Sequence, residues 1–121
     1  MRFQPPTVKF SSKGIVFNIA CVNLLPDVPY VCFARNIKDG LLFVTPIADG
    51  SDVHSVHWRV NCGKKVYPRK YGNYGFFDIL CKSMSWFSDC TYTVKGERFD
   101  TDDGEPYLRF DLNMPCRATL F

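Results

Sequence analysis

The chain has 121 residues, a formal net charge of +3 at pH 7, and 46% hydrophobic and 16% aromatic residues. This length suits a single domain (1–121) with one core, and the apolar content excludes a disordered chain. No stretch approaches the roughly 20 apolar residues of a membrane helix, and the first residues do not resemble a signal peptide. We therefore expect a cytoplasmic protein without a membrane partner.

The spacing of the cysteines indicates free thiols rather than a disulfide framework. Each cysteine lies alone within an apolar run, without the paired spacing of small secreted domains. We expect reduced, buried thiols. The six are Cys21, Cys32, Cys62, Cys81, Cys90 and Cys116.

The start of the chain predicts two short strands and a helical turn. Val8 and Phe10 alternate with polar residues after two prolines, which indicates an edge strand, and residues 15–17 continue as a second strand. Asn18 is suited to accept a backbone hydrogen bond as a helix N-cap. About two helical turns follow before Pro26, which lacks an amide donor and ends the helix.

The middle of the chain predicts a β-hairpin and a further strand. Residues 30–35 and 41–47 are rich in aromatic and β-branched side chains, and the Asp-Gly pair between them favours a hairpin turn. Apolar and polar residues then alternate over residues 54–60, which predicts a half-buried strand.

The second half of the chain predicts a loop, one long helix and two strands. Residues 62–73 contain glycines, a proline and several cations, so we expect an exposed loop. Over residues 75–87, apolar side chains recur every third or fourth position, which predicts an amphipathic helix. Two strands are expected over residues 91–94 and 107–112, around a polar excursion.

Together these elements predict an α+β fold. We expect a curved antiparallel sheet of five to seven strands, packed against one main helix. A short helical turn after Asn18 completes the expected architecture.

Residues 13–46 resemble the opening of a group of small, mostly uncharacterised proteins carried by phages and mobile elements. In that group a Gly-hydrophobic-Phe-Asn entry leads into a short helix, a Tyr-Val strand, an Asp-Gly-type turn and a strand that ends in Pro. More distantly, residues 13–47 resemble the AbrB-like DNA-binding hairpin, in which two chains interleave, and that likeness implies a homodimer. The matching positions are Gly14, Phe17, Asn18, Tyr30, Val31, Gly40 and Pro46.

Downstream of these residues, a short basic-aromatic segment interleaves four cations with three tyrosines. Cations bind phosphates and aromatic rings stack on unpaired bases, so the pattern is typical of a nucleic-acid-binding surface. The alternative is a solvated loop whose tyrosines partly cover the core. The segment consists of Lys64, Lys65, Tyr67, Arg69, Lys70, Tyr71 and Tyr74.

His54, His57 and Cys62 are the residues from which a catalytic or metal site would be built. Residues three apart on a strand point to opposite faces, so the two imidazoles would not meet at one ion. No turn motif or helix start presents the sulfur as a nucleophile. We therefore expect no catalytic residue, no metal and no cofactor.

An acidic run near the C-terminus superficially suggests a calcium loop. Its glycine, Gly104, falls one place early for an EF-hand, and strand-like residues replace the exiting helix. We expect a solvated turn. The acidic residues are Asp100, Asp102, Asp103 and Glu105.

The leading hypothesis is a non-enzymatic binding protein of phage or mobile-element origin that acts as a nucleic-acid-binding accessory or regulator. Its partner would be nucleic acid or a nucleoprotein such as a host nuclease. One alternative is an anti-CRISPR-like inhibitor that blocks a host RNA-guided nuclease by protein-protein contact. A second alternative is a small enzyme that uses His54, His57 or Cys62.

Overall fold

The computed structural model describes residues 5–25, 30–36, 38–47, 55–62, 65–68, 71–72 and 76–119. These residues form ten strands and two helices, and neither helix is long and apolar enough to cross a membrane. The helices are α1 (Ile19–Leu24) and α2 (Phe76–Met84). The strands are β1 (Thr7–Ser11), β2 (Gly14–Phe17), β3 (Tyr30–Asn36), β4 (Leu41–Ile47), β5 (Ser55–His57), β6 (Arg59–Cys62), β7 (Lys65–Pro68), β8 (Cys90–Asp100), β9 (Pro106–Asp111) and β10 (Cys116–Thr119).

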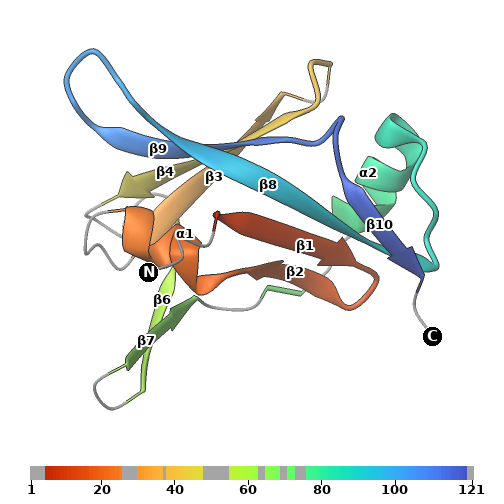
Figure 1. Ribbon diagram of the computed structural model, residues 1–121, viewed down its shortest axis with the longest axis horizontal. Coiled ribbons are helices and arrows are strands. Elements are labelled where there is room, and N and C mark those ends of the chain that lie inside the picture. The colour runs from red at the N-terminus through yellow and green to blue at the C-terminus, as the bar shows by residue number, and fades with distance from the viewer. Residues whose placement is uncertain are drawn as a thin grey trace.

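Eight of these strands form one curled antiparallel sheet in the order β2-β1-β8-β9-β4-β3-β5, with β10 also paired to β8. The long strand β8 crosses the middle of the sheet, and the β6–β7 hairpin stands apart from it (Figure 1). The first half of β8 pairs with β1 and β10, and its second half pairs with β9. Strand β8 is therefore the element on which both halves of the sheet are assembled.

The core lies on one face of this sheet, because alternate residues of a strand point to opposite faces. In β1, Val8 and Phe10 are fully buried, whereas Lys9 between them is exposed. Helix α2 packs on the inner face through the buried Phe77, whose ring centroid lies 6.5 Å from that of Tyr92. The outward residues of β1 consequently belong to the surface that faces away from the core.

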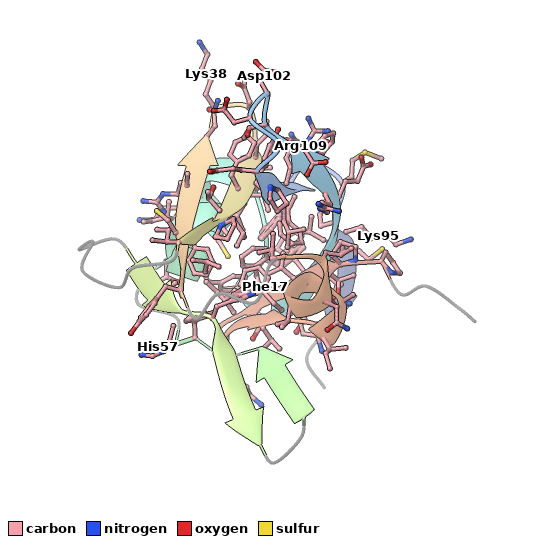
Figure 2. All side chains as sticks on the ribbon, turned by 90° about the vertical axis from the view of Figure 1, so that its left-hand side faces the viewer. Phe17, Lys38, His57, Lys95, Asp102 and Arg109 are labelled. Carbon is pink, nitrogen blue, oxygen red and sulfur yellow. The ribbon has the colours of Figure 1, made fainter. Side chains whose placement is uncertain are left out.

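Phe17, the last residue of β2, is the centre of an aromatic cluster. Its ring centroid lies 5.0 Å from that of Trp58 and 5.5 Å from that of Phe33. The centroids of Tyr71 and Phe110 lie 6.2 Å and 5.7 Å away. Figure 2 shows Phe17 among the packed side chains in the middle of the molecule. One ring thus holds together segments that are far apart in the sequence.

Asn18 caps α1 and also fixes the helix against β1. Its Oδ1 accepts hydrogen bonds from the backbone N–H groups of Thr7 at 3.0 Å and Cys21 at 3.3 Å. Its Nδ2 donates to the carbonyl oxygen of Pro5 at 2.9 Å. The single side chain therefore satisfies backbone groups of both elements.

The thiol of Cys21 is buried beside this cap. Its Sγ donates to the carbonyl oxygen of Thr7 at 3.4 Å, and burial raises the pKa of the thiol from 9.0 to about 12. The five cysteines that the structure describes with their side chains are all free thiols. The expectation of reduced thiols is confirmed for these five. Burial is confirmed only for Cys21 and Cys90, and Cys116 is exposed.

Several predictions from local sequence are confirmed. The sheet is curved and antiparallel, the β3–β4 hairpin turns at Gly40 with a φ of +69°, and Asn18 is the N-cap of α1. Helix α2 is the main packed helix. Both helices are short, so the fold is mostly sheet and fits the α+β class only loosely.

Other predictions are wrong where the sheet depends on distant pairing. The large sheet has eight strands in the described residues rather than five to seven, and β1 lies between β2 and β8 rather than at an edge. Strand β8 continues to Asp100 through the expected polar excursion, because its second half pairs with β9. Residues 62–73 contain β7, which pairs with β6, rather than a loop alone.

Substitution of the central ring tests the aromatic cluster. Phe17→Ala should lower the free energy of unfolding by about 3–5 kcal/mol, because four rings lose a common partner and a cavity remains. Urea unfolding followed by tryptophan fluorescence measures the change. Phe87→Ala is the control, since Phe87 is 57% exposed, and it should cost less than about 1 kcal/mol. Equal losses in the two variants would contradict the central role of Phe17.

The raised pKa of Cys21 predicts a stability loss in alkali. The unfolded chain ionises this thiol above pH 9.0, whereas the folded chain keeps the proton until about pH 12, so stability falls as the pH rises through this window. Cys21→Ser removes the titrating group and should flatten the fall in urea midpoint. The exposed Cys116→Ser should retain the wild-type slope. If the urea midpoint falls equally steeply with pH in the wild type and in Cys21→Ser, the attribution of the stability loss to the Cys21 thiol is refuted.

Candidate nucleic-acid interface

The predicted basic-aromatic segment begins within the β6–β7 hairpin, which projects from the sheet (Figure 1). Lys65 and Tyr67 belong to the backbone of β7, and their side chains lie outside the described residues. Tyr71 is the member of the segment that the structure describes with its side chain, so the proposed binding by the others stays a prediction. The remaining members, also outside the described residues, are Lys64, Arg69, Lys70 and Tyr74.

The backbone of Tyr71 is paired with the free side of β2. Its N–H donates to the carbonyl oxygen of Ile15 at 3.0 Å, and the N–H of Ile15 donates back to the carbonyl oxygen of Tyr71 at 2.9 Å. Gly14 lies directly beside this bridge with a φ of +140°. A Cβ atom at Gly14 would overlap the carbonyl oxygen of Tyr71, so this approach requires a glycine.

The side chain of Tyr71 is part of the core cluster. Its ring makes edge contacts with Phe33 at 5.3 Å and with Phe17 at 6.2 Å between centroids. Its hydroxyl donates a hydrogen bond to the backbone carbonyl oxygen of His57. Tyr71 therefore anchors the basic-aromatic segment to the sheet three residues before the last member, and its ring is not presented to an unstacked base.

A hollow of about 340 Å³ lies on the outer face of the sheet beside this anchor. Strand β1 contributes Lys9 and Ser11, the turn after it contributes Lys13, and β8 contributes Thr91. Lys9 and Ser11 line the hollow because they alternate with the buried residues of β1. Gly14, Val16 and Tyr71 complete the lining of the hollow.

Lys9 and Lys13 form no ion pair with a carboxylate in the described part of the chain. The ion pair between described residues joins Arg98 to Asp100 at 3.2 Å, on β8 beyond the hollow, and involves neither Lys9 nor Lys13. Thr7 pairs with Lys95 in the β1–β8 register, which adds a third ammonium group to the same outer face. Figure 2 shows Lys95 directed away from the body of the molecule. The arrangement attracts anions.

The residues considered for catalysis are only partly described. His57 lies on β5 with its ring centroid 4.7 Å from that of Tyr30, whereas His54 and the side chain of Cys62 lie outside the described residues. Burial, and secondarily the charge of Asp78, raise the pKa of the Cys81 thiol, the opposite of what activates a nucleophile. Among the residues that the structure describes, no group of His, Cys, Asp and Glu is arranged to hold a metal ion.

The acidic run forms the turn between β8 and β9. Thr101 donates from its backbone N–H to the carbonyl oxygen of Glu105 at 2.8 Å, and Gly104 has a φ of +81°. Asp102 and Asp103 are exposed at this turn. The predicted solvated turn is confirmed.

The sequence gives little sign of an aromatic row on the outer face of β4, β9 and β8. The rings of Phe99 and Tyr107 stack with centroids 5.8 Å apart, and Phe43 lies 6.2 Å from Tyr107. The guanidinium of Arg109 lies 4.4 Å from the centroid of Phe99. These contacts between rings and with the cation stabilise strand pairing. The alternation of β8 and β9 places each ring on the outer face and could have been read from the sequence. The pairing register between the strands, which the sequence does not give, brings the rings into contact.

Comparisons with protein-family models, with curated proteins and with solved structures find no match to this chain.

Two glycine substitutions test the attachment of Tyr71. Gly14→Ala places a methyl group against the carbonyl oxygen of Tyr71 and strains a positive φ, so it should destabilise the fold by more than about 2 kcal/mol. Gly104→Ala is a matched control, because Gly104 also has a positive φ but has no atom within 4 Å of an added Cβ. It should cost about 1 kcal/mol. Urea unfolding measures both changes, and equal losses would refute the close approach at Gly14.

Proposed function

We propose that this protein is a non-enzymatic nucleic-acid-binding accessory or regulator. The observation that supports the proposal is the hollow beside Tyr71, which is lined by two lysines that no described carboxylate neutralises. An anion of high charge density is the natural ligand for such a surface. The resemblance of residues 13–46 to proteins of phages and mobile elements agrees with a role of this kind.

Two parts of the sequence that carry positive charges are connected through this anchor. Lys9 and Lys13 line the hollow, and Lys70 directly precedes Tyr71 in the sequence. The bridge between Tyr71 and Ile15 therefore joins the basic-aromatic segment to β2, at the edge of the sheet.

Binding through ammonium groups makes a specific thermodynamic prediction. Each phosphate that a lysine neutralises releases condensed counterions, so affinity falls as the salt concentration rises. Such contacts position a protein on the backbone and do not read the sequence. This behaviour fits an accessory that covers or orders nucleic acid.

Fluorescence anisotropy with labelled single-stranded and duplex oligonucleotides tests the proposal. The dissociation constant should rise at least about tenfold between about 50 mM and 200 mM salt. Joint substitution of Lys64, Lys65, Arg69 and Lys70 by Ala should weaken binding about tenfold or more at the lower salt concentration. Lys38→Ala is the control, because Lys38 lies at the tip of the β3–β4 hairpin, away from Lys95 (Figure 2).

The outcome that would contradict the proposal is failure to retain DNA or RNA of either form at low salt. Unchanged binding after removal of all four cations would exclude the basic-aromatic segment from the interface. A protein that binds no nucleic acid yet blocks an RNA-guided nuclease would favour the inhibitor alternative, for which the exposed acidic turn at Asp102 and Asp103 is the available contact.

A further inference from the structure

We propose that the hollow formed by Lys9, Ser11, Lys13 and Thr91 is a subsite for one phosphate-sugar unit of a nucleic-acid backbone, and that it does not read bases. This inference rests on the proposed function and adds the mode of recognition. It depends on three properties of the hollow, namely its donors, its walls and its fixed geometry.

The donors of the hollow suit a phosphodiester. Lys9 and Lys13 supply two ammonium groups, and neither is paired with a described carboxylate. The Oγ of Ser11 accepts a hydrogen bond from the backbone N–H of Lys13 at 3.2 Å, which leaves the hydroxyl proton of Ser11 to be donated. Thr91 supplies a second hydroxyl. Charged and neutral donors that converge on one anion are the usual means of phosphate recognition.

The walls of the hollow offer no open aromatic ring on which a base could stack. Tyr71 is its aromatic residue, and the ring of Tyr71 packs against Phe17 and Phe33 while its hydroxyl is bonded to the backbone of His57. Val16 and Gly14 have no π-system and no side-chain hydrogen-bonding group. A volume of about 340 Å³ accommodates a phosphate with its sugar, at the lower end of small-ligand sites. The hollow therefore recognises the part of the polymer that is common to all sequences.

The geometry of the hollow is fixed by the sheet. Strand β1 is hydrogen-bonded on both sides, and Lys9 faces Val16 of β2 and Thr93 of β8 in the two registers. Lys13 lies in the two-residue turn between β1 and β2, and the bond to Ser11 holds its backbone in place. The backbone positions are therefore set before binding, and the ordering that remains is that of the exposed lysine side chains.

An abasic oligonucleotide, which keeps the sugar-phosphate chain and lacks every base, tests this inference. We expect the hollow to contribute equally to the binding of this probe and of a single-stranded oligonucleotide of equal length, because its contacts are to the backbone. The Lys9→Ala/Lys13→Ala double variant should weaken binding of both probes equally, by about tenfold, and should reduce the salt dependence by about two released counterions. Ser11→Ala and Thr91→Val should each weaken both probes by about two- to threefold.

Matched controls separate the possible failures. Lys38→Ala removes a lysine from a distant hairpin tip and should leave both affinities unchanged. Lys9 and Lys13 are exposed, so the double variant should keep the wild-type urea midpoint. An unchanged midpoint separates a loss of binding from unfolding. If the double variant loses at least about tenfold more affinity for the ordinary oligonucleotide than for the abasic probe, the hollow reads bases, and the inference is overturned while the proposed function stands. Normal binding by the double variant would also overturn the subsite. If neither probe binds the wild-type protein, the proposed function itself fails.

Discussion

The packing of Phe17 against four aromatic rings is the interaction on which the rest of the structure depends. The partners come from β3, from β9 and from the segments at Trp58 and Tyr71, so no local element supplies more than a part of the cluster. Such rings bury large apolar areas and gain further from their edge-to-face geometry. The cluster therefore sets how the two ends of the curled sheet and the segments outside it are held together.

The same cluster connects the core with the surface that we propose to be functional. Tyr71 contributes its ring to the core and its backbone to the edge of β2, where Gly14 permits the close approach. The basic-aromatic segment is consequently fixed at Tyr71 by contacts with the core. Binding surfaces gain affinity when such contacts reduce the conformational freedom that is lost on binding.

The cationic hollow arises from the alternation of a strand with one buried face. Val8 and Phe10 must point inward to build the core, and this places Lys9 and Ser11 outward. Because β1 lies between β2 and β8, the outward residues of three strands form one wall. The alternation that directs Val8 and Phe10 into the core therefore also directs the residues of the proposed site toward solvent. The aromatic row of Phe99 and Tyr107 follows from the same alternation, but its rings contact one another and stabilise the sheet.

Local sequence determined the elements whose partners are close along the chain. The β3–β4 hairpin, the Asn18 cap and helix α2 follow from turn residues, a capping side chain and apolar periodicity, which act over a few residues. It also located the cations of the basic-aromatic segment, because charge is a property of composition. Only the tertiary structure decided that β1 is interior, that β8 is long and that β10 joins it. It likewise decided that the ring of Tyr71 packs inward and that Lys9 and Lys13 share a hollow, since these relations require pairing between strands that no local pattern specifies.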